Sequence, residues 1–346
     1  MKRLLMLLCL IPLLVMPVRA LDYTAPEPSG VAEELMPAKD ETFGEGLWKI
    51  LRQGISTFVP LLKNTAATFV SIMSIMLLTA LLRSFPGPAA DALELAASVA
   101  IGMLLVTGSG SLIRLATDTI TQLSEYGKLL LPVLTGVLAS QGGTTTATAL
   151  YAGTAAFDAV LIGLIRNVLV PGVSMYLVIG IASAATGEGS LAKLKGFLKW
   201  LPSWLLKGIL YLFTGYMTIT GAVSGSADAA TIKAAKLTIS SVVPVVGGIL
   251  SDASEAVVIG AGVLKGAIGV YGVLAVTAIW VTPFIRIGVQ YLMLKAVAAL
   301  CTGFELKRPA GLIEDFAGAM RMLLAMTGTV LVLLLISTVC FMKAVA

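Results

Sequence analysis

The chain has 346 residues, of which 58% are hydrophobic and only 12% are charged, and its formal net charge is +5. A soluble domain carries about 25% charged residues, so this composition excludes a soluble globular enzyme and a disordered chain. The chain contains no histidine, which excludes every histidine-based catalytic triad and metal ligand. Its three cysteines follow no metal-site spacing. We therefore expect no catalytic centre, no cofactor and no bound metal.

The amino terminus has the features of a targeting signal. Lys2 and Arg3 precede an apolar stretch at 4–18, and Val18-Arg19-Ala20 offers a small-x-small cleavage site. We predict a signal peptide at residues 1–20, with an uncleaved anchor as the alternative. The Pro-rich, acidic composition of residues 21–43 predicts an extended extracytoplasmic arm.

An amphipathic helix is expected at residues 44–63. Thr42 and Glu45 have the spacing of a capping box, in which each side chain accepts a hydrogen bond from a backbone N–H group at the helix start. Apolar residues then recur at helical spacing from Leu47 to Leu62. This helix could lie on a membrane, against a partner or on the protein's own bundle.

Residues 64–346 alternate between long apolar blocks and short charged segments, which predicts a polytopic membrane domain. A 12-residue block is about 18 Å long as a helix, too short for a hydrocarbon core of about 30 Å. The short blocks are therefore re-entrant half-helices or parts of longer spans, and residues 114–128 are expected to form a surface helix. We predict an all-α polytopic membrane protein with about eight crossings, in the range of six to ten. The apolar blocks are 66–82, 92–113, 129–140, 147–165, 168–185, 208–223, 242–250, 256–274, 278–300 and 322–342.

Residues 190–207 combine leucines at helical spacing with lysines and tryptophans. Such a segment is typical of a helix that lies at the lipid headgroups, ended or kinked here by Pro202. Its basic character also predicts that this side is cytoplasmic. The residues expected at the membrane interface are Lys193, Lys195, Lys199, Trp200, Trp204 and Lys207.

An internal repeat is suggested by two similar segments. Residues 131–138 (LPVLTGVL) resemble residues 243–250 (VPVVGGIL) at an offset of 112, and Pro171 and Pro283 have the same offset. This pattern predicts parallel repeats at 114–225 and 226–342, as in some transporters, or it is a chance match in an apolar chain.

Ionisable residues inside apolar blocks are candidates for function because charges at membrane depth are costly. Asp158, Asp252 and Glu255 have this setting. They predict a pore or an assembly contact, although Asp252 and Glu255 could also lie at the polar tip of a hairpin in water.

Residues 215–255 (GYMTITGAVSGSADAATIKAAKLTISSVVPVVGGILSDASE) form a distinctive run. The chain resembles the stage III sporulation protein AE family in this run, in the block at 131–138 and in its apolar carboxyl end. The resemblance implies a place in the mother-cell membrane around the forespore. It also implies partners among the proteins of the same sporulation operon and a forespore channel protein. Neither nucleic acid nor catalysis is implied.

The resemblance thus implies an integral membrane component of a mother cell–forespore channel, needed for endospore formation and late forespore gene expression. A stand-alone secondary transporter and a non-conducting membrane scaffold are the alternatives. The candidate pore-lining or partner-contact residues are Asp158, Asp228, Lys233, Lys236, Pro244, Gly247, Gly248, Asp252 and Glu255.

Overall fold

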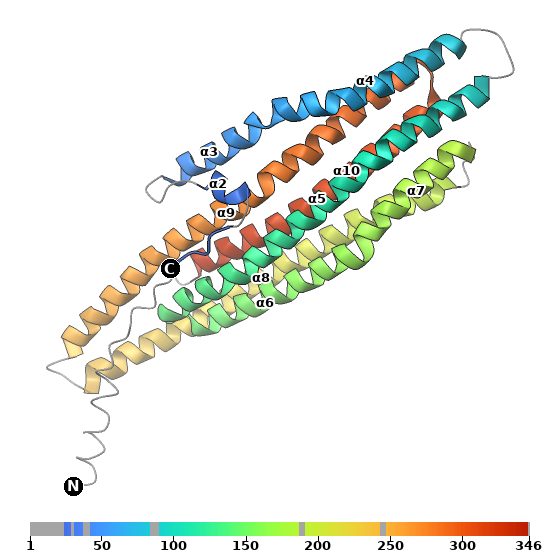
Figure 1. Cartoon of the computed structure of the whole chain (residues 1–346). Helices are drawn as coiled ribbons and strands as arrows, with labels where there is room; N and C mark the ends of the chain where they lie inside the picture. The colour runs from blue at the N-terminus through green and yellow to red at the C-terminus, as the bar shows by residue number, and fades with distance from the viewer. Residues whose placement is uncertain are drawn as a thin grey trace.

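Long helices make up the computed structural model of the chain (Figure 1). The structure describes residues 24–28, 31–36, 42–83, 90–186, 191–242 and 247–344. Only the backbone is described for residues 31, 64, 90, 221–242 and 247–265. The segment predicted as a signal peptide, part of the arm at 21–43, and Pro244 lie outside the described residues.

The helices run side by side along a common direction (Figure 1). At 1.5 Å per residue, the 51 residues of α5 extend about 76 Å, more than twice the thickness of a hydrocarbon core. The elements are α2 (Val31–Leu35), α3 (Phe43–Ser56), α4 (Phe58–Arg83), α5 (Ala90–Ser140), α6 (Thr144–Leu164), the π-helical η1 (Ile165–Leu169), α7 (Val170–Thr186), α8 (Ala192–Val242), α9 (Gly247–Gly303) and α10 (Lys307–Lys343).

Helix α3 begins at the predicted capping box. The Thr42 backbone N–H donates to Glu45 Oε2 at 3.0 Å, and the Thr42 hydroxyl donates to the same oxygen at 2.7 Å. Gly54 of α3 lies so close to α9 that an added Cβ would be 2.9 Å from Val281. The helix therefore packs on the protein's own bundle through a glycine, while Trp48 and Ile55 stay exposed.

The predicted surface helix at 114–128 is wrong, and the block at 129–140, left open as a re-entrant half-helix or part of a longer span, is part of a longer helix. They continue from the block at 92–113 as the single helix α5, and Ile120 and Leu123 are fully buried. Charged residues at intervals lower the mean hydropathy of a segment without interrupting its backbone hydrogen bonds. Pro132 lies inside the same helix, so it does not end it.

Predicted breaks within α8, α9 and the α6–α7 segment are also absent. The blocks at 147–165 and 168–185 are joined through η1, and α9 contains the blocks at 256–274 and 278–300. Helix α8 continues through Pro202, so the basic segment is the start of a 51-residue helix.

Within the described residues, five helical stretches are long and apolar enough to cross a membrane. The all-α class is confirmed, and these stretches are compatible with a multi-pass membrane protein. The count of about eight crossings is not confirmed. The predicted repeat also stays a prediction, since the turn at 141–143 corresponds, at an offset of 112, to residues 253–255 inside α9. The five stretches are Phe43–Arg83, Asp91–Ser140, Thr144–Thr186, Gly266–Gly303 and Lys307–Lys343.

Helix α10 forms the centre of the core. It packs against α5, α6, α7, α8 and α9, and its residues from 316 to 320 are all buried. The small residues Ala317, Gly318 and Ala319 allow close approach of neighbouring helices, as is common where helices pack in membranes. A buried hydrogen bond of 2.6 Å between the Thr154 and Ser337 hydroxyls joins α10 to α6.

We predict that Gly153→Ala destabilises the bundle. The new Cβ would overlap the Tyr216 ring of α8, so that the ring must move, at a cost of about 1–3 kcal/mol. The matched control is Gly163→Ala on the same helix, where the structure places no atom within 4 Å of the new Cβ. Thermal unfolding in detergent should show a lower midpoint for Gly153→Ala than for Gly163→Ala. Equal midpoints would contradict the packing described.

Candidate functional site

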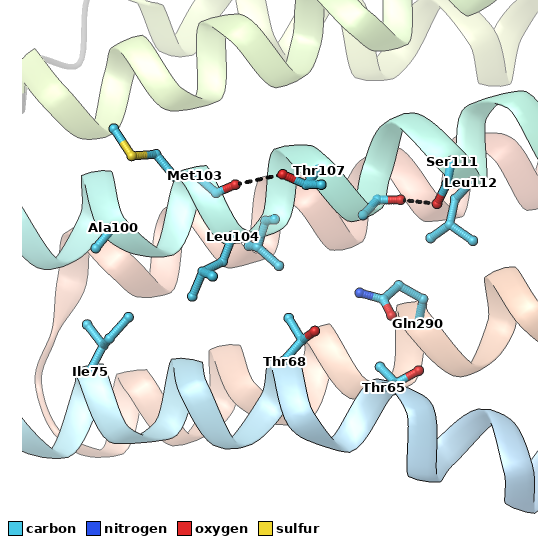
Figure 2. A pocket seen from close by; sticks show the side chains of 12 residues that line it. Thr65, Thr68, Ile75, Ala100, Met103, Leu104, Thr107, Ser111, Leu112 and Gln290 are labelled. Carbon is cyan, nitrogen blue, oxygen red and sulfur yellow. Dashed lines mark hydrogen bonds between the residues drawn. The ribbon is translucent and has the colours of Figure 1, made fainter.

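A large hollow lies between α4, α5 and α9 (Figure 2). Its volume is about 870 Å³. Apolar side chains such as Ile75 and Leu104 form part of its wall, but polar groups come from all three helices. These polar residues are Thr65 and Thr68 of α4, Thr107 and Ser111 of α5, and Gln290 of α9.

Two further hollows continue the first along α5. One of about 570 Å³ shares Thr107 and Ser111 with it, and one of about 430 Å³ shares Asp118 and Arg286 with the second. Together they form a trough that follows α5 from residue 100 to residue 122, a length of about 33 Å. We call this feature the polar trough. Its length is close to the thickness of a hydrocarbon core.

The polar trough is lined by hydrogen-bond donors and hydrogen-bond acceptors. The Thr65 and Ser111 hydroxyls donate to carbonyls of their own helices, at 2.8 and 2.7 Å, so their oxygens remain free to accept from a solute. Asp118 and Arg286 add opposite charges, and neither forms an ion pair with another residue whose side chain is described. This arrangement can replace part of the hydration of a polar solute.

Asp158 is not part of the polar trough. It is buried between α6 and α5, where the Ser124 hydroxyl donates to its Oδ2 at 2.7 Å. Its Oδ1 has no hydrogen-bond partner among the described groups. The predicted role of Asp158 in a pore therefore has no support from its position, which is that of a contact between two helices.

The other acidic, basic and glycine candidates lie in the parts of α8 and α9 for which only the backbone is described. Asp228, Lys233 and Lys236 belong to α8. Gly247, Gly248, Asp252 and Glu255 belong to the first turns of α9, next to its connection with α8. Their predicted contacts stay a prediction.

Lys195 was expected at the lipid headgroups but faces the protein interior. Its Nζ lies 2.8 Å from Asp315 Oδ2 of α10, and the Tyr176 hydroxyl of α7 donates to Asp315 Oδ1 at 3.0 Å. Because α8 is continuous and packs on α10, one side of its basic segment must be buried.

The other residues of the predicted interface set differ in exposure. Lys193, Lys207 and both tryptophans are exposed, whereas Lys199 is half-buried. The rings of Trp200 and Trp204 stack at a centroid distance of 5.7 Å.

A second polar cluster joins the ends of α4, α5 and α10. Glu94 is buried and accepts a hydrogen bond of 2.8 Å from the Arg308 backbone N–H. Arg83 lies 3.7 Å from the same carboxylate and donates to the Glu305 carbonyl at 2.8 Å. Glu305 has a φ of 55°, a left-handed conformation that the Arg83 bond helps to hold. The cluster fixes the three helix ends at one level.

Neither cluster is arranged for metal binding. Throughout the described part of the chain, no group of three or more His, Cys, Asp or Glu residues is placed to hold a metal ion.

The chain is similar in sequence to known proteins. A family model described as Stage III sporulation protein AE matches residues 32–344. The Stage III sporulation protein AE of Bacillus subtilis (strain 168) is 28% identical over 189 residues, which cover 54% of this chain and 47% of that protein. The match thus spans about half the length of the curated relative. No solved structure matches the chain.

We predict that Asp315→Asn is more damaging than Glu314→Gln. Loss of the Asp315 charge leaves Lys195 without its partner in a largely buried setting, which costs about 2 kcal/mol after allowance for its partial exposure. Glu314 pairs with Lys295 at 2.6 Å, but both side chains are more than 40% exposed, so its loss should cost under about 1 kcal/mol. Unfolding midpoints in detergent would test this order, and a reversed order would contradict it.

Proposed function

The chain belongs to the stage III sporulation protein AE family, and from this membership we propose a specific role in sporulation. The protein is an integral membrane component of a channel complex between mother cell and forespore. It resides in the mother-cell membrane that surrounds the forespore. The complex is needed for endospore formation and for late gene expression in the forespore.

The observation that supports a conducting role is the polar trough. A polar solute loses several kcal/mol of hydration free energy when it enters hydrocarbon without replacement partners. Hydroxyl, amide and charged groups line α5 from Thr107 to Gln122, a path of about 22 Å, whereas the Ala100 end of the trough is apolar. Such a path can supply those partners over most of the thickness of a hydrocarbon core.

The proposed role does not include catalysis of a reaction. The polar trough contains hydroxyl groups, amides, one carboxylate-bearing residue of α5 and basic residues, but the chain has no histidine to activate a nucleophile. We therefore propose a conduit or conduit wall and not an enzyme.

We propose that the partners are the other proteins of the same sporulation operon and a forespore channel protein, with the lipid bilayer around them. A stand-alone secondary transporter is the second candidate, favoured by the same polar trough. Solute flux into liposomes that contain this protein alone would favour the transporter. A scaffold without a pore would tolerate neutralisation of the polar trough.

We predict that the double variant Asp118→Asn, Arg286→Gln impairs late forespore gene expression. Hydrogen bonds to charged groups contribute about 1.5–3 kcal/mol each, so solute entry into the trough should be disfavoured at least about tenfold, and reporter activity should fall with it. The matched control is Arg321→Gln, which removes an exposed positive charge outside the residues that line the polar trough. Membrane levels of each variant should equal those of the unmodified protein. Normal reporter activity in the double variant would exclude the polar trough as the conduit.

We also predict that deletion of the gene in the native host leaves growth normal and blocks sporulation around engulfment. Microscopy of sporulating cells and a reporter for late forespore transcription would measure this. Unimpaired sporulation, in a host without a second copy, would contradict the proposal.

A further inference from the structure

The described part of the amino-terminal arm packs against the bundle at one end of the polar trough. It consists of the non-helical residues 24–28 and of residues 31–36, which include helix α2, and we call it the strap. Helix α2 packs against α9 and α3 (Figure 1). The strap therefore contacts helices that surround the trough without being one of the long helices itself.

The strap forms part of the wall of the trough. The hollow of about 430 Å³, which we call the end hollow, is lined by Ala32, Glu34 and Leu35 of α2 together with residues of α5 and α9. The Ala32 and Leu35 side chains are only 4% and 3% exposed, so they are packed into the bundle. Glu34 adds a carboxylate to the hollow that Asp118 and Arg286 also line.

The strap meets α5 directly after the point at which the trough ends. Gln122 is the last residue of α5 that lines the polar trough, and Tyr126 follows one helical turn later. The Tyr126 hydroxyl donates to the Pro26 carbonyl at 3.1 Å, and Tyr126 itself is buried. This bond holds the strap across the Gln122 end of the trough.

Beyond the strap, α5 and α9 are in close contact. A Cβ added at Gly272 of α9 would be 2.8 Å from the Leu130 side chain of α5, and Leu130 is buried. Leu130 lies eight residues beyond Gln122, a distance of about 12 Å along α5. A solute that reaches the end hollow therefore has no continuation between these two helices and must leave past the strap.

Helix α3 closes another side of the end hollow. Gln53 and Thr57 line the hollow, and Gly54 between them lies against Val281 of α9. Helices α3, α5 and α9 have 14, 51 and 57 residues, whereas α2 has five. An isolated helix of five residues is unstable, so α2 depends on its contacts with the bundle. The strap is thus the part of this wall that can move without unwinding a long helix.

The strap is held mainly by side-chain burial over a short length. Of its described side chains, Pro28, Ala32 and Leu35 are buried. Its three acidic residues form no ion pair with another residue whose side chain is described. Segments that are held by few buried contacts open at a lower free energy than the core of a fold.

We propose that the strap is a gate of the polar trough. In the structure it closes the trough at Gln122, and its displacement opens this end to solute while the long helices stay in place. The gate rests on the proposed conduit and adds to it the element that opens and closes the path.

A single cysteine in the end hollow tests whether the strap closes it. Thr119 lines this hollow and is 2% exposed. Thr119→Cys is introduced into the full chain after the three native cysteines are replaced by alanine. Leu35→Ser then removes apolar burial from the strap, and the matched control is Glu33→Ser, at an exposed position of α2 outside the hollow.

The rate of reaction with a water-soluble maleimide, measured in detergent, is the readout. Leu35→Ser should increase the rate at Thr119→Cys at least about tenfold, because a thiol must reach water to react, and Glu33→Ser should leave it unchanged. Tyr126→Phe, which removes the bond to Pro26 and changes no residue of the hollow, should also increase the rate. An unchanged rate in both Leu35→Ser and Tyr126→Phe would overturn the gate.

A cysteine in the first hollow shows whether the variants keep their fold. Thr68 lines that hollow, and no strap residue does. Labelling of Thr68→Cys should therefore be the same with and without Leu35→Ser. Faster labelling at both Thr68→Cys and Thr119→Cys would mean that the whole bundle has loosened, which would overturn the gate.

Solute flux separates failure of the gate from failure of the conduit. The full chain is reconstituted in liposomes that contain radiolabelled glycine, a small polar solute, and its release is measured. Release should be at least about tenfold faster with Leu35→Ser than with Glu33→Ser. Equally fast release from both would overturn the gate and leave the conduit standing. Release from neither, together with faster labelling of Thr119→Cys in Leu35→Ser, would contradict the conduit and support the strap as the movable wall of the end hollow.

Discussion

Burial of α10 is the interaction on which the other helices depend. An unpaired charge or hydroxyl is costly in a low-dielectric interior, so each polar group on this central helix requires a partner. Asp315 finds Lys195 and Tyr176, and Ser337 finds Thr154. These bonds set the heights of α6, α7 and α8 against α10. Helix α4 instead packs against α5 and α9, and the polar trough lies where these three helices meet.

The sequence predicted the helical class and the start of α3, but it divided the helices wrongly. Hydropathy reports how well a segment tolerates lipid, whereas helix continuity depends on unbroken backbone hydrogen bonds. The charges between Arg114 and Lys128 predict a surface helix, but a long helix can alternate buried residues such as Ile120 with exposed charges. Pro132 and Pro202 each remove one backbone donor, and neighbouring helices support the chain around them.

The candidate site was harder to predict than the fold. Asp118 and Arg286 are far apart in the sequence, and the threonines and serines beside them are common residues in apolar helices. No local sequence pattern identifies such residues as neighbours until the arrangement of the helices is known. The cost of a charge in an apolar segment makes Asp158 a candidate, but in the structure the Ser124 hydroxyl donates to it inside the core. Lys195 was assigned to a surface because its partner Asp315 is 120 residues away.

The π-helical segment η1 joins α6 and α7 into one continuous helical segment whose two parts pack against different neighbouring helices. Successive residues of an α-helix are rotated by about 100°, so one additional residue in a turn rotates all later side chains by that angle. Before η1, α6 packs mainly on α5 and α8; after it, α7 packs mainly on α10. The rotation of the side chains about the helix axis thus directs them toward new neighbours, as a loop between two helices would. Unlike a loop, η1 leaves no turn with unpaired backbone groups, and the helix continues across it.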